Sequence, residues 1–242
     1  MKRRSLLIGS AAMAAAPAAR ATGAGPWSVE LFTSQGCSSC PPADAELGKL
    51  IRRPDIVALS FHVDYWDYIG WKDPFASKAS TDRQKIYART LRQSSLYTPE
   101  MVFDGAAHEP GTDNSEVQAL LDQAMRRTSA RATPRLARMG DGALAIALDA
   151  FTVDRYGADV TLAVYDRHHS TPVKRGENEG ATLDNFNVVR RLEKIAAWDG
   201  QPASWTVAAD RFEPGQGVAV LVQKSGQGPM LGCYKLEPVA AG

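Results

Sequence analysis

Two cysteines, Cys37 and Cys40, lie between a short apolar segment and a stretch of helical composition, and no other feature constrains the fold as much. Residues 29–32 are mostly β-branched, aromatic or aliphatic, which favours a buried strand. Pro41 and Pro42 suit the first turn of a helix, because a missing backbone N–H there removes no hydrogen bond. The sequence therefore predicts a strand, a tight turn that carries both sulfurs, and a helix.

This position favours redox chemistry at the two sulfurs. Unpaired backbone N–H groups and the positive end of the helix dipole stabilise a thiolate. In Cys-X-X-Cys motifs at helix starts, the thiol pKa falls to roughly 3.5–7.5 from about 8.5. We predict that Cys37 and Cys40 are catalytic, with Cys37 as the more exposed nucleophile and Cys40 as the resolving thiol.

The first 21 residues have the composition of an export signal peptide and are kept out of the fold prediction. Lys2, Arg3 and Arg4 form a charged start, and residues 6–16 form an apolar run that is too short to span a bilayer. The paired arginines fit either a twin-arginine signal or an ordinary export signal. We therefore predict a periplasmic or secreted bacterial protein that has no stable membrane insertion after the signal is removed.

Composition narrows the classes of partner. When residues 1–21 are left out, the chain has 24 basic and 27 acidic residues, a formal charge of about −3, and nothing in this balance suggests a basic nucleic-acid surface. The predicted partners are protein or small-molecule thiols and disulfides, and no nucleic acid. No bound cofactor and no resident metal are predicted. The sequence leaves the oligomeric state open.

Residues 56–63 form a nearly continuous apolar run, which is typical of a central parallel strand that is covered on both faces. His62 and Asp64 stand at its carboxyl end, where catalytic groups collect in open α/β sheets, and both are candidates for proton transfer. Trp66 belongs to an aromatic and acidic cluster at residues 64–71. This cluster either packs over the sheet edge or forms an apolar platform for a partner chain beside the dithiol, and Trp66 is a candidate for substrate binding.

The pattern changes after a predicted linker at residues 129–133. Short strands separated by glycine, proline and aspartate suggest a small antiparallel sandwich or barrel. The segment 186–197 is ambiguous between strand and helix, and a strand is favoured. The predicted domains are residues 22–130 and residues 131–242. The candidate strands of the second domain are residues 143–148, 159–165, 218–223 and 230–236.

The order strand, CxxC, helix, strand, helix, Thr-Pro, strand, helix over about residues 27–130 resembles the thioredoxin fold. Residues 32–43 and 97–99 are similar to an exported bacterial thioredoxin-like family that is known only as a domain of unknown function. Gly176-Glu177-Asn178 and residues 187–190 extend this similarity. We therefore predict an α/β thioredoxin-like N-terminal domain, followed by a mainly antiparallel β C-terminal domain of sandwich or barrel type.

The resemblance also implies a second part of the site. In the thioredoxin fold, a cis-proline before the third strand lies against the dithiol and positions the backbone of the partner. Thr98 and Pro99 match that position and are predicted to bind substrate. Ser38 and Ser39 stand where thioredoxin has Gly-Pro, so the resemblance does not predict the direction of electron flow.

Three functions remain open at this point. The first is a thiol–disulfide oxidoreductase that uses Cys37 and Cys40. The second is a metal-binding or delivery module, in which two thiolates and His62 would hold copper(I). The third is a non-catalytic binding protein whose Cys37–Cys40 disulfide is structural. Cys233 is either a buried strand residue or a third thiol with a redox or intermolecular role.

Overall fold

The computed structural model describes residues 25–127 and 130–238, so the predicted export signal lies outside the described residues. The helices of the described part are α1 (Pro41–Leu50), α2 (Lys78–Thr90) and α3 (Asn114–Arg127), with 3-10 turns η1 (Asp67–Ile69) and η2 (Ala209–Arg211). The strands are β1 (Trp27–Thr33), β2 (Ile56–His62), β3 (Glu100–Phe103), β4 (Ala107–Glu109), β5 (Arg135–Arg138), β6 (Leu144–Leu148), β7 (Ala158–Pro172), β8 (Thr182–Trp198), β9 (Ala203–Val207), β10 (Gln216–Lys224) and β11 (Met230–Leu236).

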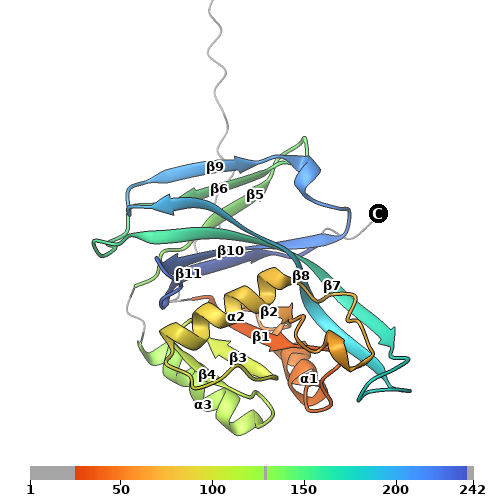
Figure 1. The fold of residues 1–242 in the computed structure, drawn as a ribbon. Helices are drawn as coiled ribbons and strands as arrows, with labels where there is room; N and C mark the ends of the chain where they lie inside the picture. The colour runs from red at the N-terminus through yellow and green to blue at the C-terminus, as the bar shows by residue number, and fades with distance from the viewer. Residues whose placement is uncertain (1–24, 128–129, 239–242) are drawn as a thin grey trace, which may run out of the picture.

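One mixed sheet runs through the molecule in the order β11-β10-β7-β8-β2-β1-β3-β4 (Figure 1). β1 and β2 are parallel, and α1 connects them, so the predicted strand–turn–helix–strand unit is present. β3 pairs with β1 in the antiparallel sense. Every residue of β1 and β2 is buried, as the continuous apolar run at residues 56–63 indicates.

The predicted division into a thioredoxin-like α/β domain and a separate antiparallel β domain is wrong. β8 is paired with β7 along its length, and it also pairs in the parallel sense with β2 through Ser60 and Val188. Strands from both halves of the chain therefore belong to one eight-stranded sheet. The described residues are mostly β, with three α-helices and no closed barrel. The predicted boundary between residues 130 and 131 stays a prediction.

The edge of β2 that faces away from β1 is the physical reason why strands from both halves of the chain form one sheet. An unpaired edge strand buried in the core would leave N–H and C=O groups without partners, at a cost in free energy. β8 covers that edge, and the Asn187 side chain donates from Nδ2 to the carbonyl oxygen of Ala58 at 2.8 Å. Asn187 has a φ of 44°, a conformation that asparagine adopts more readily than most residues. The segment 186–197 is a strand, as favoured by its sequence.

The three remaining strands form a small sheet in the order β5-β6-β9. Leu144, Ile146 and Leu148 of β6 pack against the alternate residues Val160, Leu162 and Val164 of β7 and their neighbours on β10. The intervening residues of β7, Ala163 and Tyr165, belong to the cluster that contains Tyr87 of α2. The period of two along β7 therefore places the small sheet on one face of the strand and α2 on the other.

The helices cover the part of the large sheet that holds β1 and β2. α1 and α3 pack against Val29 and Leu31 of β1, while α2 packs on the opposite face against Phe32. Gly48 of α1 leaves room for Phe186 of β8, because a Cβ at Gly48 would lie 2.6 Å from the ring atom Cε2. The β7–β8 hairpin consequently ends beside α1 (Figure 1). No helix of the described part is long and apolar enough to cross a membrane.

Candidate functional site

Cys37 and Cys40 form a disulfide immediately before α1, with their Cα atoms 5.5 Å apart. The Cys37 N–H donates to the Ser34 carbonyl oxygen at 3.1 Å, and the Cys40 N–H donates to the Cys37 carbonyl oxygen at 3.2 Å. Cys40 is the N-cap of α1, and a proline follows it in the first turn. The sequence predicts this local arrangement from the apolar strand residues before the cysteines and from the two prolines after them.

Both cysteines are fully buried in the disulfide, so the prediction that Cys37 is the more exposed is wrong. Ser38 and Ser39, which lie between them, are exposed. Trp66 lies next to the loop, because a Cβ at Gly36 would be 3.3 Å from the Trp66 Cβ. The buried sulfurs are therefore separated in the chain only by two exposed serines.

The structure brings the dithiol loop against the Thr98–Pro99 segment. The Thr98–Pro99 peptide bond is cis, which confirms that conformational prediction. The Ser39 hydroxyl lies 3.3 Å from the Cys37 sulfur and donates to the Thr98 carbonyl oxygen at 3.5 Å. The Trp66 indole N–H donates to the Thr98 hydroxyl at 2.7 Å. Four of the predicted site residues, Cys37, Trp66, Thr98 and Pro99, thus gather around one loop.

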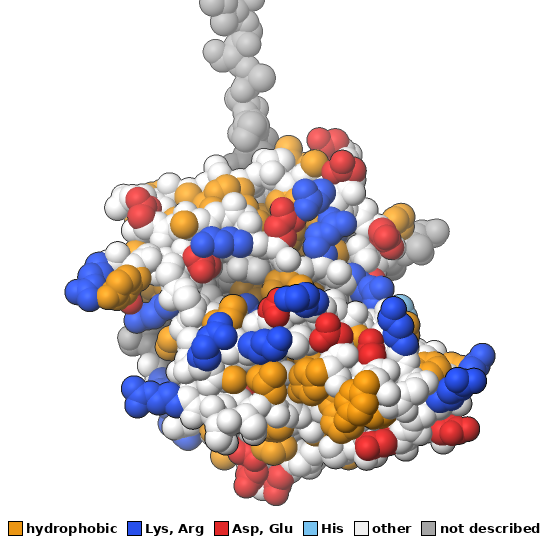
Figure 2. Space-filling view, in the orientation of Figure 1, with side chains coloured by type: hydrophobic (Ala, Val, Ile, Leu, Met, Phe, Trp, Pro, Cys, Tyr) orange, Lys and Arg blue, Asp and Glu red, His pale blue; other side chains and the backbone are white. Residues whose placement is uncertain are grey.

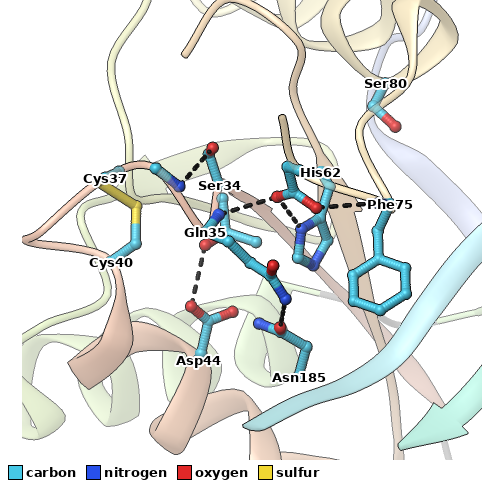
Figure 3. A network of polar contacts seen from close by, with 12 residues as sticks. Ser34, Gln35, Cys37, Cys40, Asp44, His62, Phe75, Ser80 and Asn185 are labelled. Atoms are coloured by element: carbon cyan, nitrogen blue, oxygen red, sulfur yellow. Dashed lines mark hydrogen bonds and ion pairs between the residues drawn. A yellow bond between two sulfur atoms is a disulfide. The ribbon is translucent and has the colours of Figure 1, made fainter. Parts of the chain in front are cut away.

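His62 lies in a buried polar network beside the dithiol loop, on the far side of Gln35 from the disulfide (Figure 3). Its Nδ1 is 2.7 Å from the Asp73 carboxylate, which also accepts the backbone N–H of Gln35 at 2.8 Å and of Phe75 at 2.9 Å. Burial opposes ionisation of Asp73, but His62 and these two N–H groups outweigh it and lower the pKa of Asp73. The other ring nitrogen of His62, Nε2, is buried without a hydrogen-bond partner.

Asp64 is not directed into this network. The Thr81 hydroxyl of α2 donates to the Asp64 carboxylate at 2.6 Å. The Asp64 backbone N–H in turn donates to the Thr81 hydroxyl oxygen at 3.1 Å. Asp64 therefore binds the start of α2, whereas His62, the other predicted proton-transfer residue, is fully buried in the core.

Asp44 is a buried acid of the site that sequence reasoning did not select. It follows Cys40 by one turn of α1, and the Thr33 hydroxyl donates to its carboxyl at 3.0 Å. Burial raises its pKa to about 7, while nearby His62 and the hydrogen bonds from Thr33 and Asn185 act in the opposite direction. Its second carboxyl oxygen is buried without a hydrogen-bond partner. The helical period of the sequence could have indicated that Asp44 is buried, since Asp44 lies on the same inward face of α1 as Leu47.

The β7–β8 hairpin end, residues 173–181, forms the opposite side of the site. Glu177 accepts the backbone N–H of Ser38 at 3.0 Å. Asn178 donates from Nδ2 to the carbonyl oxygens of Gln35 at 2.9 Å and Cys37 at 3.0 Å. About 140 residues separate these partners in the chain. No local sequence pattern pairs residues at that separation, so only the tertiary structure reveals these contacts.

Asn185 and Gln35 connect the hairpin to the buried network. The Gln35 side-chain amide N–H donates to the Asn185 side-chain oxygen at 2.9 Å (Figure 3). The Gln35 side-chain oxygen accepts the Trp71 indole N–H at 3.2 Å. The aromatic loop, the dithiol loop and β8 are therefore joined by side-chain hydrogen bonds around Gln35.

Cys233 lies on β11, far from the CxxC loop in the sequence. It is a free cysteine and is buried. Its sulfur donates to the Pro26 carbonyl oxygen at 3.3 Å. Burial raises the pKa of the Cys233 thiol to about 12, against the smaller effect of nearby Arg131. Cys233 is thus a free, buried strand residue, one of the two alternatives that the sequence leaves open.

The model of a family of unknown function, DUF1223, matches residues 28–223, which is most of the chain and includes the whole site. The chain belongs to the DUF1223 family. It is also similar to a protein of Agrobacterium tumefaciens with an X-ray crystal structure, at 33% identity and a TM-score of 0.80, covering 92% of this chain and 98% of the other. No protein with a curated description matches the chain.

The family match confirms the part of the predicted resemblance that concerns a domain of unknown function. The match spans the dithiol loop, the Thr98–Pro99 segment and the β7–β8 hairpin in one model, so these parts belong to one family unit. Within residues 25–127 and 130–238, no group of three or more His, Cys, Asp and Glu residues is arranged to hold a metal ion.

Proposed function

We propose that this DUF1223 protein is a thiol–disulfide oxidoreductase that uses the Cys37–Cys40 pair. The observation that carries the proposal is the position of the disulfide: it lies at the N-terminus of α1, beneath two exposed serines, with Ser39 in contact with the carbonyl oxygen before the cis-proline. A helix N-terminus favours a thiolate, which is the species that attacks disulfides. A purely structural bridge requires neither feature.

The reaction is a two-step exchange. The Cys37 thiolate attacks one sulfur of a partner disulfide, so that a Cys37–partner bond forms and the other partner sulfur leaves as a thiolate. The Cys40 thiolate then attacks the Cys37 sulfur, which re-forms the Cys37–Cys40 disulfide and releases the second partner thiolate. The protein is oxidised by two electrons and the partner is reduced by two. The same steps run in reverse when the partner is a dithiol.

The neighbouring residues have supporting roles in this proposal. Thr98 and Pro99 present a backbone edge to the partner chain, and Trp66 holds Thr98 in place through its indole hydrogen bond. The proton that the Cys40 thiol loses in the second step needs an acceptor. Asp44 suits that role, because burial raises its pKa to about 7 and it lies one turn after Cys40, whereas Asp64 accepts a hydrogen bond from Thr81 of α2. His62 interacts electrostatically with Asp44 and shares the role.

We further propose that residues 1–21 export the protein to an oxidising compartment. The disulfide is consistent with such a compartment, where protein disulfides persist. Determination of the N-terminal mass of the protein recovered from the periplasm or the medium tests this proposal: a chain that begins after Ala21 supports it, and an intact N-terminus contradicts it.

The experiment that tests the redox function is the equilibrium reduction potential of the Cys37–Cys40 pair. The protein is equilibrated in glutathione or dithiothreitol buffers, and the alkylated thiols are counted by mass, with Cys37→Ser as the control. A reversible two-electron transition between about −120 and −270 mV, the range of known redox proteins, supports an oxidoreductase. A potential below about −300 mV indicates a structural bridge and overturns the proposal.

A further inference from the structure

The dithiol loop is held by a carboxylate from the distant half of the chain. Glu177, on the β7–β8 hairpin end, accepts the backbone N–H of Ser38, the residue that directly follows Cys37. The carboxylate is therefore fixed within one peptide unit of Cys37. This hydrogen bond lowers the pKa of Glu177, so its negative charge is present at neutral pH.

The hairpin end is anchored at this place by independent contacts. Asn178, the next residue, donates to the carbonyl oxygens of Gln35 and Cys37. Gly176, the preceding residue, has a φ of 82° and lies against the aromatic loop, since a Cβ there would be 3.3 Å from the Trp71 Cβ. Contacts on both sides of Glu177 thus hold its backbone in place next to the CxxC loop.

We propose that Glu177 is a positioning residue for the redox reaction, whose negative charge disfavours the Cys37 thiolate and thereby favours the disulfide form. The inference rests on the proposed function, because it concerns the same dithiol. Its physical basis is repulsion between like charges: reduction of the disulfide creates a thiolate next to a carboxylate that is already ionised. A helix N-terminus acts in the opposite direction, so the hairpin partly cancels the effect of α1 on the thiolate.

The test compares the native protein with Glu177→Gln, whose amide oxygen can still accept the Ser38 N–H. After reduction with dithiothreitol, the rate of Cys37 alkylation by iodoacetamide is measured against pH. The expected result is a rate midpoint that is lower by about 0.5 pH unit in the variant, the order of magnitude of the Coulomb effect of one nearby unit charge in a solvent-like dielectric. The difference should shrink in 1 M salt, where the Debye length is about 3 Å.

Glu179→Gln is the matched control, because Glu179 is exposed on the same hairpin end and its removal changes the net charge equally. The other ionisable groups around the loop are the same in both variants, so they do not affect the comparison: Asp44 on α1, His62 on β2, Asp73 in the loop after β2, and Lys174 and Arg175 on the hairpin end. A midpoint that moves equally in both variants overturns the proposal.

The alkylation rate of Cys37 reaches a plateau at high pH, and this plateau distinguishes an effect of the Glu177 charge from an effect of Glu177 on the access of iodoacetamide. If Glu177 acts only as a cover, Glu177→Gln raises the plateau and leaves the midpoint unchanged, and this result also overturns the proposal.

A second measurement keeps the inference distinct from the redox function. Dithiothreitol reduces the bridge by a two-electron exchange, which gives cyclic oxidised dithiothreitol, a Cys37 thiolate, a Cys40 thiol and one proton. At pH 9, the equilibrium constant for this reduction should be about threefold larger in Glu177→Gln, which corresponds to 0.5 pH unit. A structural bridge with a very low potential would refute the proposed function, but it would still show this threefold difference if the inference holds. An unchanged constant refutes the inference alone.

Discussion

The Trp66 indole N–H donates to the Thr98 hydroxyl at 2.7 Å, and this contact joins the aromatic loop after β2 to the segment before β3. Thr98 also presents its carbonyl oxygen to the Ser39 hydroxyl in the dithiol loop. Trp66 is therefore linked to the exposed surface of the CxxC motif through a single residue. Figure 2 shows that hydrophobic side chains gather on one face of the lower half of the molecule, between basic and acidic groups.

Trp66→Phe should slow the reaction of the reduced protein with a peptide disulfide by about fivefold, the equivalent of one neutral hydrogen bond. Its reaction with oxidised dithiothreitol should change less, because a small disulfide does not depend on the backbone edge at Thr98. Stopped-flow measurement of both rates checks this prediction. Equal slowing with both disulfides would mean that Trp66 acts on the dithiol and not on the partner.

Asp44→Asn should change the pH dependence of stability. The folded-state pKa of Asp44, about 7, lies above the ordinary value of 3.8, so the carboxyl is protonated in the folded state and ionised in the unfolded state between these values. Its contribution to stability is therefore fully present below pH 3.8 and is lost as the pH rises to about 7, by about 1.4 kcal/mol per pH unit.

Urea unfolding at pH 4.5 and pH 7.5 measures this effect. Relative to the native protein, Asp44→Asn should gain on the order of 3 kcal/mol between the two pH values. The amide keeps an oxygen that can accept the Thr33 hydroxyl, so the variant retains that hydrogen bond. A stability difference that is the same at both pH values would show that Asp44 does not titrate in this range.

Arg83→Met should destabilise the protein by about 3–5 kcal/mol, because it leaves the buried carboxylate of Glu30 without its cationic partner. Arg83 of α2 donates to Glu30 of β1 at 2.8 Å and to Gln223 of β10 at 3.1 Å, so it ties together strands from both halves of the sheet. The double variant Glu30→Gln/Arg83→Met should recover much of the loss. Chemical denaturation of both variants gives the comparison, and equal destabilisation by both would contradict the ionic explanation.

Cys233 should serve as a probe of global unfolding. Its thiol has a pKa of about 12 because it is buried, so at pH 8 it should react with iodoacetamide about a thousandfold more slowly than an ordinary cysteine. Mass analysis after partial labelling of the reduced native protein should show the label at Cys37 before Cys233. Labelling of Cys233 should follow the fraction unfolded in urea. Rapid labelling under native conditions would contradict the buried position of this residue.

The sequence predicts the dithiol region well because its determinants are local. Apolar strand residues, two cysteines and two prolines lie within 14 consecutive residues, so the signals for the strand and for the start of the helix are close together in the chain. The order β1, α1, β2, α2, β3 and α3 also agrees with the predicted order of strands and helices, whereas β4 was not predicted. The cis conformation before Pro99 came from the family resemblance, and the structure has it.

The predicted fold, a thioredoxin-like α/β domain followed by a separate antiparallel β domain, was wrong because β-sheet pairing is not a local property. A strand pattern indicates which residues are buried, but it does not specify which edge the strand joins. β8 joins both β7 and β2, and the hydrogen bond of Asn187 to Ala58 spans 129 residues of the chain. The change in pattern after residue 130 reflects more antiparallel structure: β5, β6 and β9 form the small sheet, whereas β7, β8, β10 and β11 join the large sheet of β1 and β2.

What the sequence by itself determined is the chemistry that is available: two thiols at the start of a helix, and an aromatic loop and a proline segment that follow in order. What only the tertiary structure decided is the environment of those thiols. Burial gives Asp44 its raised pKa, and the β7–β8 hairpin places Glu177 beside Ser38. Both effects depend on distances between residues that are remote in the chain, because desolvation and Coulomb interactions act through space and not along the sequence.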